Sequence, residues 1–216
     1  MKKFERELVR GYLHEPEHDT LGKGLVLTHG AGANCESPLM KAVAEEFCRA
    51  GFHVLRFDLP FRQQKPKGPP FPALAGRDRE GLRNAVAAMR EITPNYVAMG
   101  GHSYGGRQAS MLAAESPGLA DALLLLAYPL HPPHRQDQMR TAHFPQLRTP
   151  ALFVHGAPDG FATLEELLEA MRLIPVHTEW IELESGGHAL KPEVAKECLQ
   201  RFLHSKALGG SGAVLQ

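Results

Sequence analysis

The sequence predicts an α/β fold in which helices cover both faces of a mostly parallel sheet of about six to seven strands. Short apolar runs alternate with amphipathic segments along the chain, and this alternation is typical of parallel strands joined by helices. The run at 121–127 is apolar after its first position, as expected of a strand buried on both faces. At 216 residues, of which 43% are hydrophobic, the chain has the size of one domain with a substantial core.

Several segments have the length and composition of strands. Most are short apolar runs, and the last one alternates between apolar and polar positions, which fits a strand near the edge of the sheet. The predicted strands are 25–28, 53–58, 96–100, 121–127, 151–155 and 177–183.

Helices are predicted where apolar residues recur every three or four positions. The first has Ser37 as a cap and Pro38 in its first turn, and Gly51 follows its end. Thr163 and Glu166 have the spacing of a capping box, in which two side chains satisfy the N–H groups at a helix start. The predicted helices are 38–50, 82–89, 106–115, 163–171 and 192–204.

A long irregular segment is predicted at 60–76, where five prolines make regular structure unfavourable. It follows the carboxyl end of a predicted strand, and this edge of an open α/β sheet is where ligands bind. The connections in the last helix–strand units are short, so the sequence leaves little room for a large cap domain. Whether 60–76 acts as a lid stays open at this point.

The composition argues against several classes of function. Lys and Arg together number 24, as do Asp and Glu, so bulk charge favours neither nucleic acid nor a membrane surface as a partner. No apolar run approaches the ~20 residues that a membrane helix needs, and the start of the chain does not resemble a signal peptide. Cys35, Cys48 and Cys198 have no metal or redox spacing, and an odd cysteine number without a secretion signal favours a cytoplasmic location.

The end of the chain differs in composition from the rest. Residues 209–212, Gly-Gly-Ser-Gly, have the composition of a flexible linker. Residues 213–216, Ala-Val-Leu-Gln, resemble the non-prime side of a coronavirus main-protease cleavage site. We therefore interpret 1–208 as a single domain and 209–216 as a linker with a protease-site remnant of expression.

Ser103 lies in the pentapeptide Gly-His-Ser-Tyr-Gly at 101–105, the most informative motif of the chain. Gly-x-Ser-x-Gly is the nucleophile elbow, a sharp turn between a strand and a helix that lifts a serine hydroxyl above the sheet. The predicted strand 96–100 precedes the motif and the predicted helix 106–115 follows it, which is the context that the motif requires. We therefore predict that Ser103 is a nucleophile.

A serine nucleophile needs a base, and the base needs an acid that orients it. In this strand–elbow–helix architecture, the chain order is serine, then Asp or Glu, then histidine. Asp159 and His188 each follow the carboxyl end of a predicted strand, so both can meet Ser103 at one edge of the sheet. Asp121 is the alternative acid, but it begins its strand and so lies at the opposite edge. The alternative bases are His29, His102 and His155.

An acyl-transfer site also needs two N–H groups that stabilise the oxyanion of the tetrahedral intermediate. One is predicted to be the backbone N–H of Tyr104, the residue after the nucleophile. The other is predicted in the loop 29–33, whose small residues let the backbone approach a substrate closely. We predict that the N–H of Ala31 fills this role.

Four further residues are candidates for substrate contact, namely His29, Arg56, Arg107 and His131. Arg107 lies in the first turn of the elbow helix, where a cation opposes the helix dipole. Either an internal carboxylate or an anionic substrate should compensate it, and the internal partner is favoured because buried charges are usually paired. His131 and His134 flank two prolines with no third ligand nearby, so no metal site is predicted. The segment 128–143 is expected to shape access to the cleft.

Together these motifs resemble the α/β-hydrolase superfamily over nearly all of 22–206. Within it, the chain resembles the small capless branch of dienelactone-hydrolase-like proteins, and more closely the group related to testis-expressed protein 30 and the KANSL3 hydrolase-like domain. The segments that carry the resemblance are 28–32, 55–57, 101–107, 128–133, 155–159 and 187–188. The resemblance implies an α/β-hydrolase fold and cofactor-free hydrolysis of an ester-like bond. Dienelactone hydrolases use a cysteine nucleophile where this chain has Ser103, which argues against the lactonase activity itself.

The sequence thus predicts a serine hydrolase that cleaves a small carboxylic ester or thioester through an acyl-enzyme. Its expected partner is a small-molecule acyl substrate, and the chain is expected to be a monomer or a homodimer. Two alternatives stay open. One is acyl transfer on the same triad, which product analysis with competing acceptors would separate from hydrolysis. The other is a catalytically silent scaffold that binds proteins, in which the triad would be expected to be degraded.

Overall fold

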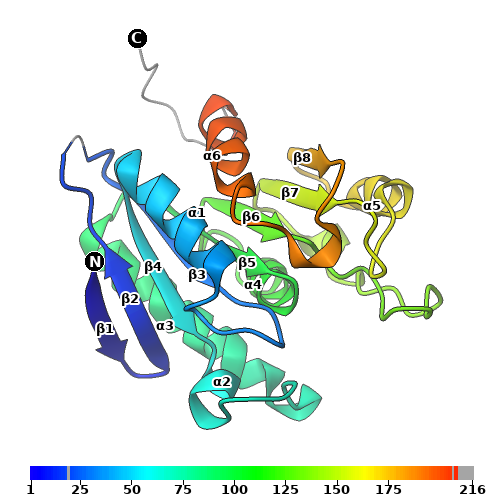
Figure 1. Ribbon diagram of the computed structural model, residues 1–216, viewed down its shortest axis with the longest axis horizontal. Helices are drawn as coiled ribbons and strands as arrows, with labels where there is room; N and C mark the ends of the chain where they lie inside the picture. Colours follow the sequence, from blue (N-terminus) through cyan, green and yellow to red (C-terminus); the bar gives the residue numbers. More distant parts are fainter. Residues whose placement is uncertain (19, 206, 209–216) are drawn as a thin grey trace.

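The protein contains an eight-stranded sheet with the order β1-β2-β4-β3-β5-β6-β7-β8 (Figure 1). The computed structural model describes residues 1–18, 20–205 and 207–208, so the interpretation of 209–216 lies outside the described residues. The strands from β3 to β8 are parallel, whereas β2 is antiparallel to both β1 and β4. The strands are β1 (Lys2–Arg6), β2 (Val9–His14), β3 (Lys23–Thr28), β4 (Phe52–Asp58), β5 (Val97–His102), β6 (Ala122–Leu126), β7 (Ala151–Gly156) and β8 (Thr178–Leu183).

Helices cover both faces of this sheet, as predicted. The helices α1 and α6 pack together over one face, and α3, α4 and α5 pack over the other (Figure 1). The central strand β6 is buried at every position, which matches its continuous apolar sequence. The helices are α1 (Pro38–Arg49), α2 (Pro60–Gln64), α3 (Ala75–Ile92), α4 (Tyr104–Glu115), α5 (Leu164–Met171) and α6 (Val194–His204), with 3₁₀ turns η1 (Pro72–Leu74), η2 (Phe144–Gln146) and η3 (Gly187–Ala189).

The predicted capping box at the start of α5 is confirmed. The Thr163 hydroxyl accepts a hydrogen bond from the Glu166 N–H at 3.1 Å, and the Glu166 carboxylate accepts one from the Thr163 N–H at 2.8 Å. These two bonds satisfy N–H groups that have no partner inside the helix. The capping box thereby fixes the end of the loop from β7 where it enters α5.

The sheet extends beyond the predicted strands at its N-terminal edge. Both β1 and β2 were absent from the sequence prediction, which had about six to seven strands. The sequence of β1 is Lys-Lys-Phe-Glu-Arg, and four of its five residues are exposed. An edge strand of this kind is charged on the outside and pairs on one side only, so it lacks the apolar signal of a buried strand.

The segment 60–76 is more regular than predicted. Pro60 begins α2 and Pro72 begins η1, while α3 already starts at Ala75. Proline at the first position of a helix loses no hydrogen bond, because the N–H groups there have no intrahelical partner. The prolines therefore mark helix starts here, and only the stretch between α2 and η1 remains irregular.

The fold places the predicted site residues at one edge of the sheet. The carboxyl ends of β3, β5, β7 and β8 all lie at this edge, because these strands are parallel. The connection from β6 to β7 contains only the short η2, and no cap domain covers this edge within the described residues. Across the same residues, no helix combines the length and the apolar character that crossing a membrane requires.

Candidate active site

Ser103 sits in a strained turn between β5 and α4. Its backbone has φ 49° and ψ −114°, a conformation that a residue with a side chain rarely adopts. The Ser103 N–H donates to the carbonyl of Leu126 at 2.8 Å, which anchors the turn to the end of β6. The turn therefore has the backbone geometry that the elbow motif predicts.

The structure brings Ser103, His188 and Asp159 together in one hydrogen-bonded chain. Ser103 Oγ lies 2.7 Å from His188 Nε2, and His188 Nδ1 lies 2.9 Å from Asp159 Oδ2. A carboxylate only accepts, so Nδ1 carries the proton and Nε2 is left to accept the serine proton. The other carboxylate oxygen of Asp159 accepts from the Phe161 N–H at 2.8 Å, and the side chain of Asp159 is fully buried. Asp159 is thus held in one orientation toward His188.

Two aromatic rings hold His188 from other directions. The ring of Phe161 stacks on the imidazole with centroids 4.0 Å apart and planes 28° apart. His102 Nε2 lies 2.7 Å from the His188 carbonyl, and because a carbonyl only accepts, His102 donates this bond. Burial lowers the pKa of His102, so its ring stays neutral at this position. Sequence reasoning missed Phe161, since nothing in the spacing of an aromatic residue after Asp159 signals a stack on a distant histidine.

The alternative bases do not contact the nucleophile. His29 is fully buried and His155 is 1% exposed, while His102 bonds to the backbone of His188 rather than to Ser103. Burial lowers the pKa of each of these three side chains. Among the four histidines considered, only His188 lies within hydrogen-bonding distance of the Ser103 hydroxyl.

The loop after β3 packs directly against the elbow. A Cβ atom at Gly30 would lie 2.8 Å from His102 Nδ1 and 3.4 Å from Ser103 Cβ, so a side chain there would crowd the turn. His29 Nδ1 lies 2.8 Å from the Gly30 carbonyl, and His29 Nε2 accepts from the Leu59 N–H at 3.2 Å. With Nε2 as acceptor, the neutral ring must donate from Nδ1 to the Gly30 carbonyl. Burial lowers the pKa of His29 to about 4, which agrees with a neutral ring.

This bond orients the predicted oxyanion donor. In a trans peptide the carbonyl of Gly30 and the N–H of Ala31 point in opposite directions. Because His29 holds the carbonyl, the N–H of Ala31 is fixed on the side away from the His29 ring. The structure therefore gives His29 a positioning role in the loop and not the exposed position that substrate contact requires.

Arg62 fixes the same loop from the other side and was not predicted from the sequence. Its guanidinium donates to the carbonyls of Ala31 at 2.5 Å and Ala33 at 2.8 Å. It also donates to the carbonyls of Lys65 at 2.9 Å and Gly68 at 3.1 Å, and Arg62 is only 6% exposed. One buried cation thus ties the loop after β3 to the segment after α2.

Tyr104 begins α4 and has its side chain anchored away from Ser103. Its hydroxyl donates to Asp78 Oδ2 at 2.7 Å, and its ring packs edge-on against Phe61. Asp78 Oδ1 accepts from the Phe61 N–H at 2.9 Å, and burial raises the pKa of Asp78. The Tyr104 N–H belongs to the first turn of α4, where backbone N–H groups have no intrahelical acceptor.

Arg56 and His131, two more of the predicted substrate-contact residues, have buried side chains. Arg56 is 1% exposed; it donates to His14 Nε2 at 2.9 Å and to the Cys35 carbonyl at 2.7 Å. His131 is 2% exposed and lies 3.3 Å from the Glu166 carboxylate. These side chains stabilise the interior and leave no surface for a substrate, so the structure corrects both predictions.

Arg107 differs from them. It is half-buried, and no carboxylate lies within ion-pair distance of it in the described part of the chain. The guanidinium Nε is buried without a hydrogen-bond partner. The internal carboxylate that the sequence favoured for Arg107 is therefore not found among the described residues.

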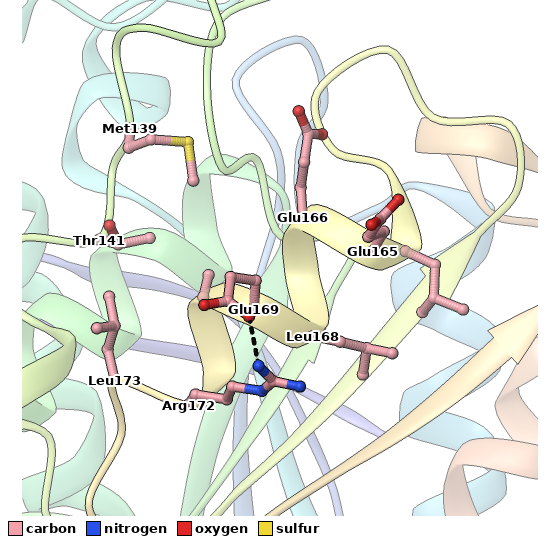
Figure 2. Close-up of a pocket in the computed structure, with 10 residues that line it drawn as sticks. Met139, Thr141, Glu165, Glu166, Leu168, Glu169, Arg172 and Leu173 are labelled. Carbon is pink, nitrogen blue, oxygen red and sulfur yellow. Dashed lines mark hydrogen bonds and ion pairs between the residues drawn. The ribbon is translucent and has the colours of Figure 1, made fainter.

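A separate hollow lies beside α5 (Figure 2). Its volume is about 980 Å³, and it is lined by the segment around Met139 and Thr141 and by acidic and apolar residues of α5. None of Ser103, Asp159 and His188 lines it, so the hollow is distinct from the candidate active site. Over the described residues, no cluster of three or more His, Cys, Asp or Glu side chains has an arrangement that could hold a metal ion.

Comparisons with known proteins agree with this architecture. Residues 22–210 match the family described as an alpha/beta hydrolase domain. An α/β serine hydrolase homologue from Coxiella burnetii superposes with a TM-score of 0.75 at 14% identity, covering 93% of this chain and 95% of that chain. Dienelactone hydrolase from Anabaena variabilis gives a TM-score of 0.70 at 21% identity over 89% and 88% of the two chains. Est1E from Butyrivibrio proteoclasticus, bound to ferulic acid, gives 0.72 at 17% identity over 93% and 98%.

Proposed function

The chain belongs to the α/β-hydrolase domain family, and we propose that it is a serine hydrolase of small carboxylic esters or thioesters. The observation that carries the proposal is the hydrogen-bonded chain from Ser103 through His188 to Asp159. Nucleophile, base and orienting acid in this order are the minimum that acyl transfer through a serine requires.

In the first half of the reaction, the Ser103 hydroxyl attacks the acyl carbon of the substrate. His188 Nε2 accepts the serine proton across 2.7 Å as the Oγ–C bond forms. Asp159 stabilises the positive charge that develops on the imidazole and keeps the proton on Nδ1. His188 then gives its proton to the departing alcohol or thiol, which leaves the acyl group on Ser103.

The tetrahedral intermediate carries a negative oxygen that needs two donors. The N–H groups of Tyr104 and Ala31 are our candidates, since Gly30 brings the loop against the elbow and His29 fixes the peptide that contains the Ala31 N–H. Donors that are already oriented need no reorganisation when the charge forms, which is the main source of their effect on rate.

In the second half, a water molecule replaces the leaving group. His188 removes a proton from the water, which attacks the acyl carbon, and Ser103 regains its proton from His188 as the acid departs. The absence of a cap over the described part of the chain supports a small substrate. The ferulic acid bound to the Est1E neighbour is a small ligand of the same size class.

Steady-state and pre-steady-state turnover of p-nitrophenyl acetate tests the proposal. The wild-type protein is expected to release p-nitrophenol in a burst that reflects acylation, and Ser103→Ala is expected to show no burst. Adding a competing alcohol and analysing the products separates hydrolysis from acyl transfer. Equal rates for wild type and Ser103→Ala would contradict a serine mechanism.

A further inference from the structure

Asp78 is a buried carboxylate that joins two segments next to the candidate active site. It lies in the first turn of α3 and is 1% exposed. One carboxylate oxygen accepts from the Phe61 N–H at 2.9 Å, and the other accepts from the Tyr104 hydroxyl at 2.7 Å. Burial raises the pKa of Asp78, so these two bonds offset the cost of keeping a carboxylate inside the protein. The two donors belong to α2 and α4, which are far apart in the sequence.

The Tyr104 hydroxyl anchors the start of the elbow helix. Tyr104 is the first residue of α4 and directly follows Ser103, whose backbone is strained at φ 49° and ψ −114°. A strained turn keeps its conformation only when the structure around it holds it there. The bond from Tyr104 to Asp78 supplies one such restraint, because it ties the residue after the nucleophile to α3. The candidate oxyanion donor on this side is the backbone N–H of the same tyrosine.

The Phe61 N–H anchors α2 in a similar way. This helix has only five residues, and no side chain caps its N-terminus at Leu59. Such a short helix is not stable by itself, and the N–H groups of its first turn have no intrahelical acceptor. Pro60 lacks an N–H, so Phe61 carries the first one in α2, and Asp78 accepts its bond. The position of α2 is therefore set from α3.

The sequence lets these helices approach each other closely. The helix α2 lies beside the start of α3 (Figure 1). A Cβ atom at Gly81 of α3 would lie 2.7 Å from Cγ and Cδ of Pro60, so a larger residue there would push α2 away. The rings of Phe61 and Tyr104 also pack edge-on, with centroids 5.6 Å apart and planes 85° apart. The two residues that Asp78 binds are thus in contact with each other as well.

Through α2, Asp78 also reaches the second candidate donor. Arg62 follows Phe61 in α2 and donates to the carbonyl of Ala31 at 2.5 Å. The ring centroid of Phe61 lies 5.7 Å from that of His29. His29 holds the carbonyl of the peptide that contains the Ala31 N–H. Both supports of this N–H are therefore next to the residue whose backbone Asp78 fixes.

We propose that Asp78 is a positioning residue that sets the distance between the two N–H donors of the oxyanion hole, one at Tyr104 and one at Ala31. It holds α4 through one carboxylate oxygen and α2 through the other. This inference rests on the proposed hydrolase function, since the donors matter only when an oxyanion forms between them. Each donor must lie about 3 Å from the oxyanion, and a displacement of about 1 Å can lower a rate about 100-fold. A carboxylate that only stabilised the fold would change stability without such a selective loss of rate.

The most direct test removes the Tyr104 hydroxyl and leaves its ring in place. Tyr104→Phe is expected to lower kcat for p-nitrophenyl acetate about ten-fold, with KM changed less than about two-fold, because oxyanion donors act in the transition state. Tyr96→Phe is the matched control, since it removes another tyrosine hydroxyl that donates inside the protein, to the Leu208 carbonyl. This control is expected to keep the wild-type kcat, because Tyr96 precedes β5 and Ser103 follows it, so they lie at opposite edges of the sheet.

Two substitutions at Asp78 provide a rescue experiment. In Asp78→Asn, the amide oxygen can accept from the Phe61 N–H and the amide NH2 can donate to the Tyr104 hydroxyl oxygen, so both links are kept. Asp78→Ala keeps neither link. We expect Asp78→Asn to stay within about three-fold of the wild-type kcat and Asp78→Ala to lose about 100-fold. Should Asp78→Ala fail to fold, Tyr104→Phe still tests the link to α4.

Binding of a transition-state analogue separates the oxyanion donors from the rest of the site. With phenyl trifluoromethyl ketone, Ser103 Oγ adds to the carbonyl carbon, its proton passes to His188 Nε2, and the carbonyl oxygen becomes the oxyanion. The inhibition constant of this ketone is expected to rise in Tyr104→Phe by the same factor by which kcat/KM falls. Acetophenone, which has no fluorine atoms to favour the adduct, should inhibit wild type and Tyr104→Phe equally.

The outcomes distinguish this inference from the proposed function. A wild-type protein that turns over no ester and binds no ketone would contradict the hydrolase, and the positioning role with it. Ester turnover that is the same in wild type, Tyr104→Phe and Asp78→Ala would support the hydrolase and overturn the positioning role. A rise in KM at unchanged kcat, equal weakening of both ketones, or a kcat as low in Asp78→Asn as in Asp78→Ala would also overturn it.

Discussion

Two sets of polar side chains differ in how completely they are paired: the candidate catalytic residues and two half-buried arginines. In the first set, which we call the catalytic flank, Ser103, His188 and Asp159 form a continuous chain of hydrogen bonds. By contrast, the half-buried guanidinium groups of Arg107 and Arg140 donate no hydrogen bond and form no ion pair within the described residues. The groups that we propose for proton transfer are therefore paired within the chain, whereas the two guanidinium groups are not.

Removing a member of the catalytic flank should have the largest effect. Ser103→Ala and His188→Ala are each expected to lower kcat for p-nitrophenyl acetate by about 10⁴-fold or more, because the triad acts as a unit. Ser103→Ala should leave the thermal unfolding temperature nearly unchanged, since it removes one partly exposed hydroxyl. Kinetics and thermal unfolding on the same samples check both points. If His188→Ala kept most of the activity, the base would have to be another residue.

Loosening the support of the oxyanion loop should have the next largest effect. Arg62→Gln leaves the carbonyls of Ala31, Ala33, Lys65 and Gly68 without their common donor. We expect kcat to fall about 10- to 100-fold with a smaller change in KM, because an oxyanion donor acts mainly in the transition state.

The same experiment should include Arg77→Gln, which changes an exposed arginine, as its control. A change in KM alone, with kcat preserved, would mean that Arg62 does not position the loop for chemistry.

The free energy of unfolding should distinguish Arg56, whose guanidinium is hydrogen-bonded, from Arg107, whose Nε has no partner. Arg56→Gln is expected to lower the free energy of unfolding by about 2–4 kcal/mol, because it leaves the Cys35 carbonyl and His14 without partners inside the protein. Arg107→Gln is expected to leave the free energy of unfolding unchanged or to raise it, since it removes an unpartnered Nε and a like-charge repulsion. Urea unfolding of both variants checks the contrast. Equal losses would show that Arg107 is as structural as Arg56.

The smallest predicted effect concerns pH. Burial, followed by the charges of Arg107 and Arg79, lowers the pKa of His143 to about 4, against about 6.5 for an unperturbed histidine. Between these values the unfolded chain binds a proton that the folded protein excludes, so the free energy of unfolding should fall as pH drops from about 6.5 to about 4. His143→Gln should reduce that slope by at most about 1.4 kcal/mol per pH unit. Urea unfolding at several pH values measures the slope, and an identical slope in both proteins would count against a buried neutral His143.

The parallel part of the fold could be predicted because its strands carry a strong apolar signal. The continuous apolar sequence of β6, with helical patterns before and after it, predicts a sheet that is covered by helices on both faces. The edge strand β1 could not be predicted in this way, because its residues are mostly charged and exposed. At 60–76 the prolines predict an irregular segment, because proline interrupts helices and strands, yet Pro60 and Pro72 occupy the first helical position, where proline is favourable.

The positions of Ser103, Asp159 and His188 could be predicted because each follows a strand in a fixed chain order. The contacts of Arg62 with the loop after β3 could not be predicted. Their acceptors are backbone carbonyls, which every residue type carries. Arg56 was predicted to contact the substrate although it lies between the apolar residues Leu55 and Phe57 of β4, a position that already indicated burial. Which charged side chains remain unpaired depends on contacts between distant segments.

The measurement that tests the central claim most directly is intact-protein mass spectrometry after treatment with a fluorophosphonate. The wild-type protein is expected to gain the mass of a single adduct, because His188 activates the Ser103 hydroxyl for attack at phosphorus. The adduct should be lost in Ser103→Ala and strongly reduced in His188→Ala, while Arg107→Gln should still form it. An unmodified wild-type protein, or an adduct that persists in Ser103→Ala, would contradict the assignment of Ser103 as an activated nucleophile.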